Sequence, residues 1–172
     1  MTDWKTVVGR HHQAVWQTAY RLLGNQADAL DCCQEAFLDA VCLDGREAVL
    51  DWPALLRCLA TARALDLLRA RYRRKSRSVP LIDPSVVVSP GPRPDQQAEA
   101  SELAERLRAA LSRLPTKQAE VFCLRWVEEM TYEQIADRLE VDPNTVGVLL
   151  HRARKRLRRL LASADVETKR SG

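Results

Sequence analysis

The segment from Thr131 to Leu161 constrains the fold most strongly, because it contains two helix signals separated only by a short turn. Thr131 is followed three residues later by Gln134, which is the capping-box pattern of a helix start. Asp142 followed by Pro143 is a second helix start, with proline at the first helical position. The segment therefore predicts a helix-turn-helix, a motif whose second helix can enter the major groove of DNA.

Two dense basic runs stand out in a chain whose formal net charge is only +4. Residues 69–77 contain six cations in nine positions, and residues 152–159 contain six in eight. Such runs are typical of anchoring points for a polyanion. The alternative, which the sequence leaves open, is that each run is the solvated face of an ordinary helix.

Helical periodicity accounts for nearly all of the remaining sequence, and we predict an all-α fold. The expected helices before the helix-turn-helix include Trp4 to Leu23, Ala27 to Leu43, Pro53 to Lys75 and Ser101 to Leu114. Five prolines between residues 80 and 94 preclude a continuous helix there. We therefore predict two small helical domains, residues 1–76 and 101–172, joined by a proline-rich linker over residues 77–100.

The expected second helix has an apolar stripe and a polar, acidic face. The stripe includes Leu30, Phe37 and Val41, and we expect Phe37 to pack in the core. The opposite face is either simply solvated or available to a basic partner surface.

Several other function classes are disfavoured by the sequence. It has no apolar stretch near the roughly 20 residues of a membrane span, and its N-terminus lacks the apolar core of a secretory signal, so we expect a cytoplasmic protein. The five cysteines show no CxxC spacing, and we expect them to be reduced, with no metal site and no cofactor. No glycine-rich phosphate loop or nucleophile elbow is present, and we expect no enzymatic activity.

Three segments together resemble a known family. They are LLGNQADALDCCQEAFLDA at residues 22–40, LRCLATARALDLLRARYRR at 56–74, and residues 107–161, where LP, VF, TYEQIA, TV and HRAR follow in order. With these motifs the chain resembles bacterial RNA polymerase sigma factors of the extracytoplasmic-function (ECF) type. The resemblance covers nearly the whole chain.

The resemblance implies a transcription initiation factor that binds core RNA polymerase and directs it to promoter DNA. Its first domain would dock on the polymerase and contact the −10 element, and its second would read the −35 element. An anti-sigma factor is a further candidate partner. The alternative function is a helix-turn-helix regulator that does not engage polymerase.

The candidate site residues fall into three groups. Matching the polymerase-docking helix of the family are Asp31, Gln34 and Glu35. The candidates for contacts on the −10 side are Arg63, Arg69, Arg71, Arg73 and Arg74. The candidates for contacts on the −35 side are Asn144, Thr145, Val148, Arg152, Arg154 and Lys155.

Three positions depart from the family pattern. Residues 61–62 are Thr-Ala where the family commonly has Arg-Asn, which leaves Arg63 as a partial substitute for −10 recognition. Residues 147–149 are Gly-Val-Leu in place of Lys-Ser-Arg, so that Val148 would touch thymine methyl groups or a protein partner. Glu140 occupies a turn position where glycine is common, and a positive φ there would cost about 1–2 kcal/mol.

Overall fold

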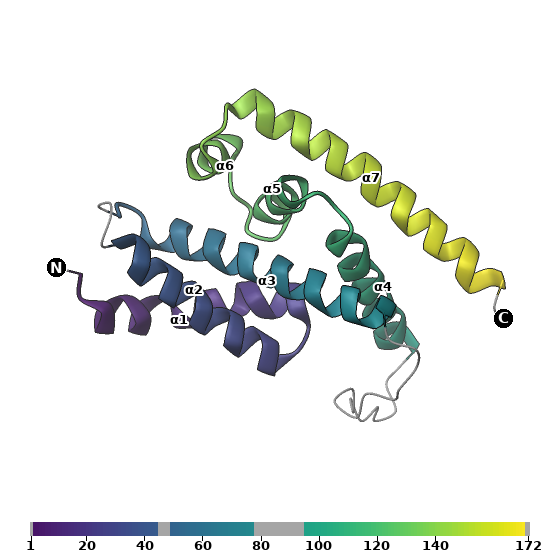
Figure 1. The fold of residues 1–172 in the computed structure, drawn as a ribbon, viewed down its shortest axis with the longest axis horizontal. Coiled ribbons are helices and arrows are strands. Elements are labelled where there is room, and N and C mark those ends of the chain that lie inside the picture. Colours follow the sequence, from purple (N-terminus) through teal and green to yellow (C-terminus); the bar gives the residue numbers. More distant parts are fainter. Residues whose placement is uncertain (1, 45–48, 78–94, 171–172) are drawn as a thin grey trace.

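The computed structural model describes residues 2–44, 49–77 and 95–170 of the 172-residue chain. These residues form seven helices and no strand, which confirms the predicted all-α class. Figure 1 shows their arrangement. The helices are α1 (Trp4–Leu23), α2 (Gln26–Asp44), α3 (Trp52–Arg77), α4 (Asp95–Ser112), α5 (Thr116–Trp126), α6 (Tyr132–Leu139) and α7 (Pro143–Arg170).

Short polar side chains and one glycine set the helix ends in the first part of the chain. The Asp3 carboxylate accepts a hydrogen bond from the Thr6 backbone N–H at the start of α1. Gly24 ends α1 in the left-handed conformation, with φ 74° and ψ 7°. At the start of α3, Asp51 Oδ1 accepts from the Ala54 N–H at 2.9 Å. The predicted bounds of α1 are confirmed because both of its ends are coded locally.

Helix α4 differs most from expectation. It begins at Asp95, inside the segment predicted to be linker, rather than near Ser101. The prolines end at residue 94, so nothing prevents a helix from starting directly after them. Residues 78–94 of the expected linker lie outside the described residues, and the division into two domains stays a prediction.

Helix α3 lies between two groups of helices. On one side it packs against α1 and α2, which also pack against each other. On the other side it contacts α4 and α5, and α7 runs along α4, α5 and α6 (Figure 1). We call residues 2–77 the N-terminal half and residues 95–170 the C-terminal half. The two halves therefore meet along α3.

One buried apolar cluster spans both halves. It joins Leu65 and Leu68 of α3 to Leu111 and Leu114, and it extends to Leu157 of α7. A second cross-half cluster places Ala54 of α3 among apolar residues of α5, α6 and α7. The halves thus share hydrophobic core rather than touching only at their surfaces.

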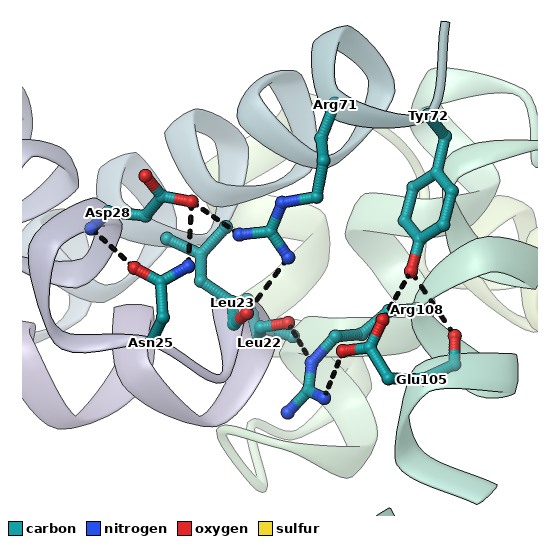
Figure 2. Close-up of polar contacts among 8 residues, drawn as sticks. All are labelled: Leu22, Leu23, Asn25, Asp28, Arg71, Tyr72, Glu105 and Arg108. Atoms are coloured by element: carbon teal, nitrogen blue, oxygen red, sulfur yellow. Dashed lines mark hydrogen bonds and ion pairs between the residues drawn. The ribbon is translucent and has the colours of Figure 1, made fainter. Parts of the chain in front are cut away.

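Hydrogen bonds along the edge of this packing also cross between the halves (Figure 2). Arg108 of α4 donates from Nε to the Leu22 carbonyl at 2.9 Å and from Nη1 to Glu105 at 2.9 Å. The Tyr72 hydroxyl donates to Glu105 Oε2 at 3.0 Å. Glu105 therefore accepts from both Arg108 and Tyr72, which fixes α4 against the ends of α1 and α3.

At the other end of α3 the contact is made by different residues. Arg138 Nη2 donates to the Asp51 carbonyl at 3.0 Å. Glu128 lies against Arg57 at 4.0 Å with its side chain only 4% exposed. Its Oε1 atom is buried and has no hydrogen-bond partner within the described part of the chain.

A Gly24→Ala substitution tests the contact between the halves. A Cβ at residue 24 would lie 2.6 Å from the Arg108 guanidinium carbon, and the positive φ disfavours alanine. We expect a loss of about 1–2 kcal/mol from backbone strain and about 1 kcal/mol more from displacing the Arg108 hydrogen bond. Urea unfolding followed by circular dichroism measures the change.

Gly9→Ala is the matched control, because Gly9 lies inside α1 with no atom near its would-be Cβ. That variant should gain about 0.5–1 kcal/mol from helix propensity. Equal stability of the two variants would contradict the proposed role of the Gly24–Arg108 contact.

Candidate nucleic-acid interface

The turn of the helix-turn-helix is fixed by bonds between neighbouring residues. Gln134 N donates to Thr131 Oγ1 at 3.2 Å and Thr131 N donates to Gln134 Oε1 at 2.9 Å, which confirms the predicted capping box. Glu140 ends α6 with φ 53° and ψ 47°, and its N–H donates to the Ala136 carbonyl. The positive φ considered for Glu140 is therefore present.

The start of α7 is also capped as predicted. Asp142 Oδ1 accepts from the Asn144 N–H at 2.8 Å, and the Asp142 carbonyl accepts from the Thr145 N–H at 2.9 Å. Pro143 is the first helical residue, where its missing N–H removes no hydrogen bond. The first turn of α7 is thus rigidly held at the surface.

Helix α7 divides cleanly into a buried and an exposed face. The buried face consists of Val146, Leu150, Ala153 and Leu157, at helical spacing. All six residues predicted for the −35 side are exposed, namely Asn144, Thr145, Val148, Arg152, Arg154 and Lys155. The core of the C-terminal half therefore holds α7 with these side chains turned to solvent.

The Gly-Val-Leu departure at residues 147–149 affects the two faces differently. Leu149 is half-buried against the core cluster that contains Ile135. Val148 is 48% exposed and places an apolar side chain on the outer face. Of these three residues, Val148 alone adds an exposed apolar side chain to the interface.

Beside this face lies a group of aromatic and cationic side chains that the sequence pattern did not reveal. The Arg154 guanidinium lies 4.7 Å from the centre of the Trp126 ring, and Arg125 lies 5.6 Å from the same ring. Trp126 is half exposed. In the sequence it ends an apolar helix, so its pattern does not distinguish it from a core residue.

Among the predicted −10 cations, Arg63, Arg69 and Arg71 pair with carboxylates of the described residues. Arg63 donates from Nε and Nη2 to the two carboxylate oxygens of Asp39. Arg69 Nη1 lies 3.2 Å from Asp66 Oδ1 in the next turn of α3. Their charges are thus partly compensated in this arrangement.

Of these three arginines, Arg71 contacts both a carboxylate and a backbone carbonyl (Figure 2). It donates to the Asp28 carboxylate and, at 3.1 Å, to the Leu23 carbonyl. Burial alone would raise the pKa of Asp28. Hydrogen bonds from Asn25 and Arg71 and the charge of Arg71 outweigh this effect, so the pKa lies below its usual value. The Asp28–Arg71 pair is therefore charged at neutral pH.

The two remaining cations of this group, Arg73 and Arg74, are exposed near the end of α3. Thr61, where the family pattern has arginine, is buried, and its hydroxyl has no hydrogen-bond partner in the described residues. Thr61 therefore faces the core and offers no contact to a partner.

The predicted docking residues Asp31, Gln34 and Glu35 are all exposed on α2. Leu30 and Val41, which were expected to face inward, are instead 44% and 46% exposed. The inward expectation was wrong for these two residues because small side chains fill the helix interface in their place. Phe37 is buried, as predicted.

Comparisons with known proteins match both halves of the chain. A family model described as sigma-70 region 2 matches residues 7–74, and one described as sigma-70, region 4, matches residues 104–157. The chain is 30% identical over 171 residues to the RNA polymerase sigma-E factor of Streptomyces avermitilis, covering 97% of this chain and 89% of that protein. This chain belongs to the sigma-70 factors.

Further relatives assign the chain to the extracytoplasmic-function (ECF) group of these factors. The ECF RNA polymerase sigma factor SigE of Mycolicibacterium smegmatis is 34% identical over 171 residues, covering 99% of this chain, which spans 66% of that protein. The ECF RNA polymerase sigma factor EcfG of Rhodopseudomonas palustris is 31% identical over 83% of this chain and 76% of that protein. A solved structure of the sigma factor RpoE from Bartonella quintana, in complex with the anti-sigma factor NepR, shares the fold, with a TM-score of 0.53 at 24% identity and coverage of 94% and 98%.

The ECF sigma factor therefore has its region 2 and region 4 segments in contact, since the two matched ranges lie in the two halves that share a core. The packing leaves the outer face of α7 exposed but covers part of α3, where the Arg69 side chain is 18% exposed. Within the described residues, no helix is long and apolar enough to cross a membrane, and no cluster of three potential metal ligands occurs.

The cysteines of this sigma factor are free, and all but two are buried. Burial raises the pKa of the Cys32 and Cys123 thiols to about 12, so these thiols stay protonated at neutral pH. Cys42 is exposed and Cys58 is half-buried.

Glu140→Gly is expected to stabilise the helix-turn-helix. Glycine adopts the observed φ of 53° without the steric cost that glutamate pays, which is about 1 kcal/mol. The Tm in a calorimetric scan should rise accordingly. As a control, Glu102→Gly in the exposed interior of α4 should lower stability by about 1 kcal/mol. A loss of stability in Glu140→Gly would show that its side chain makes compensating interactions.

Proposed function

We propose that this ECF sigma factor binds core RNA polymerase through α2 and directs it to promoters through α3 and α7. The observation that carries the proposal is the division of α7 into two faces. Its apolar face packs in the core, and all six predicted DNA-contacting residues are exposed. A helix held in this way can place its N-terminal side chains in a major groove. Catalysis of RNA synthesis would belong to the polymerase, in the cytoplasm.

The face of α2 supports polymerase docking over the alternative of a regulator that acts without polymerase. Gln34 and Glu35 are exposed, and Leu30 and Val41 add exposed apolar surface on the same helix. An apolar surface bordered by acidic and amide groups fits a basic helical partner. A regulator acting through DNA alone would have no use for this face.

On the −10 side we propose that Arg73 and Arg74 make the first phosphate contacts, because both are already exposed. Arg63 and Arg71 would have to exchange the carboxylates of Asp39 and Asp28 for phosphates. Arg69 would become accessible as α4 moves away from α3. An anti-sigma factor stays a candidate partner, and the exposed Val148 is one point it would contact.

The double variant Gln34→Ala, Glu35→Ala tests polymerase docking. We expect its affinity for core polymerase to fall by about tenfold or more, since the substitutions remove two polar interactions of about 1 kcal/mol each. Titration of fluorescently labelled sigma factor with core enzyme measures the affinity. The matched control is Gln97→Ala, Glu99→Ala, which removes the same side-chain types from the exposed face of α4. Equal affinity of both double variants would refute docking through α2.

The double variant Asn144→Ala, Arg152→Ala tests promoter reading by α7. Removing each side chain's hydrogen bonds to a base should cost about 1–3 kcal/mol, so run-off transcription from the sigma factor's promoter should fall by about tenfold or more. A −35 sequence replaced by random bases should abolish the difference between wild type and variant.

Arg158→Ala, Arg159→Ala is the control for charge, because both arginines are exposed on α7 beyond the predicted contact set. This control should weaken binding to all duplexes alike and reduce its salt dependence. If both double variants lose the same activity on intact and randomised −35 sequences, α7 provides charge but no sequence recognition.

A further inference from the structure

A cavity of about 750 Å³ lies where the end of α3 meets α4. Its lining includes four cations, Arg69, Arg73 and Lys75 from α3 and Arg113 just after α4. Asp66 is the one carboxylate among the lining residues that the structure describes, and Tyr72 adds an aromatic ring. Both halves of the sigma factor contribute, so the cavity in this form exists only while they are packed together.

The positive charge of this cavity is poorly compensated. Arg69 pairs with Asp66, but its Nη2 atom is buried and has no hydrogen-bond partner among the described residues. Arg73, Lys75 and Arg113 are exposed and form no ion pair with any described carboxylate. Packing the halves brings Arg113 near the two cations of α3, which is unfavourable unless an anion binds between them.

The size and chemistry of the cavity indicate the class of anion. Its volume falls within the roughly 300–1,000 Å³ typical of small-molecule sites. Arginine guanidinium groups bind phosphate oxygens through paired, charge-assisted hydrogen bonds. Ser76 and Ser112 also line the cavity, but their hydroxyls already donate to the carbonyls of Arg73 and Ala109, so the cations are the groups that would bind an anion. Among the described lining residues, four cations against one carboxylate favour several phosphate groups over one.

We propose that this cavity binds a small molecule with at least two linked phosphate groups, and that the bound molecule holds the two halves together. Arg69 is only 18% exposed, so a DNA duplex would reach it only after the halves separate. The exposed Arg73 is open to DNA already, but the bound molecule would occupy it. The molecule would therefore compete with promoter binding. The regulatory part of the proposal rests on the proposed sigma function, whereas the binding part does not.

Inorganic triphosphate is the probe for binding. Isothermal titration of the full chain, at constant ionic strength, should show saturable binding of triphosphate and much weaker binding of sulfate. Arg73→Gln and Arg113→Gln, one from each half, should each lower the affinity by about tenfold. Arg158→Gln, an exposed arginine of α7 away from the cavity, should leave the affinity unchanged. An equal decrease in all three variants, or equal binding of sulfate and triphosphate, would overturn the proposed site.

Small-angle scattering and transcription test the regulatory part. In mild urea, scattering should show that the free chain expands without triphosphate and stays compact with it. Arg113→Gln should remove this protection. In run-off transcription with magnesium raised to offset chelation, triphosphate should inhibit the wild type more than Arg113→Gln. Equal inhibition would overturn the regulatory proposal. Binding without any promoter-directed transcription would instead refute the sigma function and leave the site intact.

Discussion

The structure depends on α3 being covered on two opposite sides. Helices α1 and α2 pack on one side of it and α4 and α5 on the other. Small residues such as Ala60 and Ala64 allow the neighbouring helices to approach closely, while Leu56, Leu65 and Leu68 fill the space between them. Beyond the core, α3 continues as the basic run, which is exposed from Arg73 onward. The same helix therefore supports the packing of the two halves and carries the cations predicted to contact the −10 side.

The contact between the halves contains both favourable and unfavourable terms. Shared apolar residues and the bonds of Arg108 and Tyr72 favour packing. The buried carboxylate of Glu128 opposes it, because one oxygen has no partner among the described residues and Arg57 lies 4.0 Å from the other. Arg108 bonds to a neutral carbonyl, which water can replace at small net cost. This balance is what a protein needs if its halves are to separate when a larger partner binds.

Much of the fold follows from local sequence, whereas the state of the charges does not. The Thr131–Gln134 capping box was predicted, and a left-handed Glu140 was considered, because each involves only neighbouring residues. The partners of Arg63 and Arg71 lie 24 and 43 positions away, so no local pattern reveals them. The exposure of Leu30 was missed for a related reason, since helical spacing gives a face but not how far the neighbouring helices cover it.

These ion pairs rank the arginines of region 2 by how readily they can engage DNA. Arg73 needs no exchange of partners, because it is exposed and unpaired among the described residues. Arg71 must give up both the Asp28 carboxylate and the Leu23 carbonyl, and a phosphate offers it about the same charge-assisted bond that it already has. Its net gain from DNA is therefore small, and its main contribution is to hold the α1–α2 turn against α3. In this sigma factor, density of positive charge in the sequence overstates the number of cations available to a promoter.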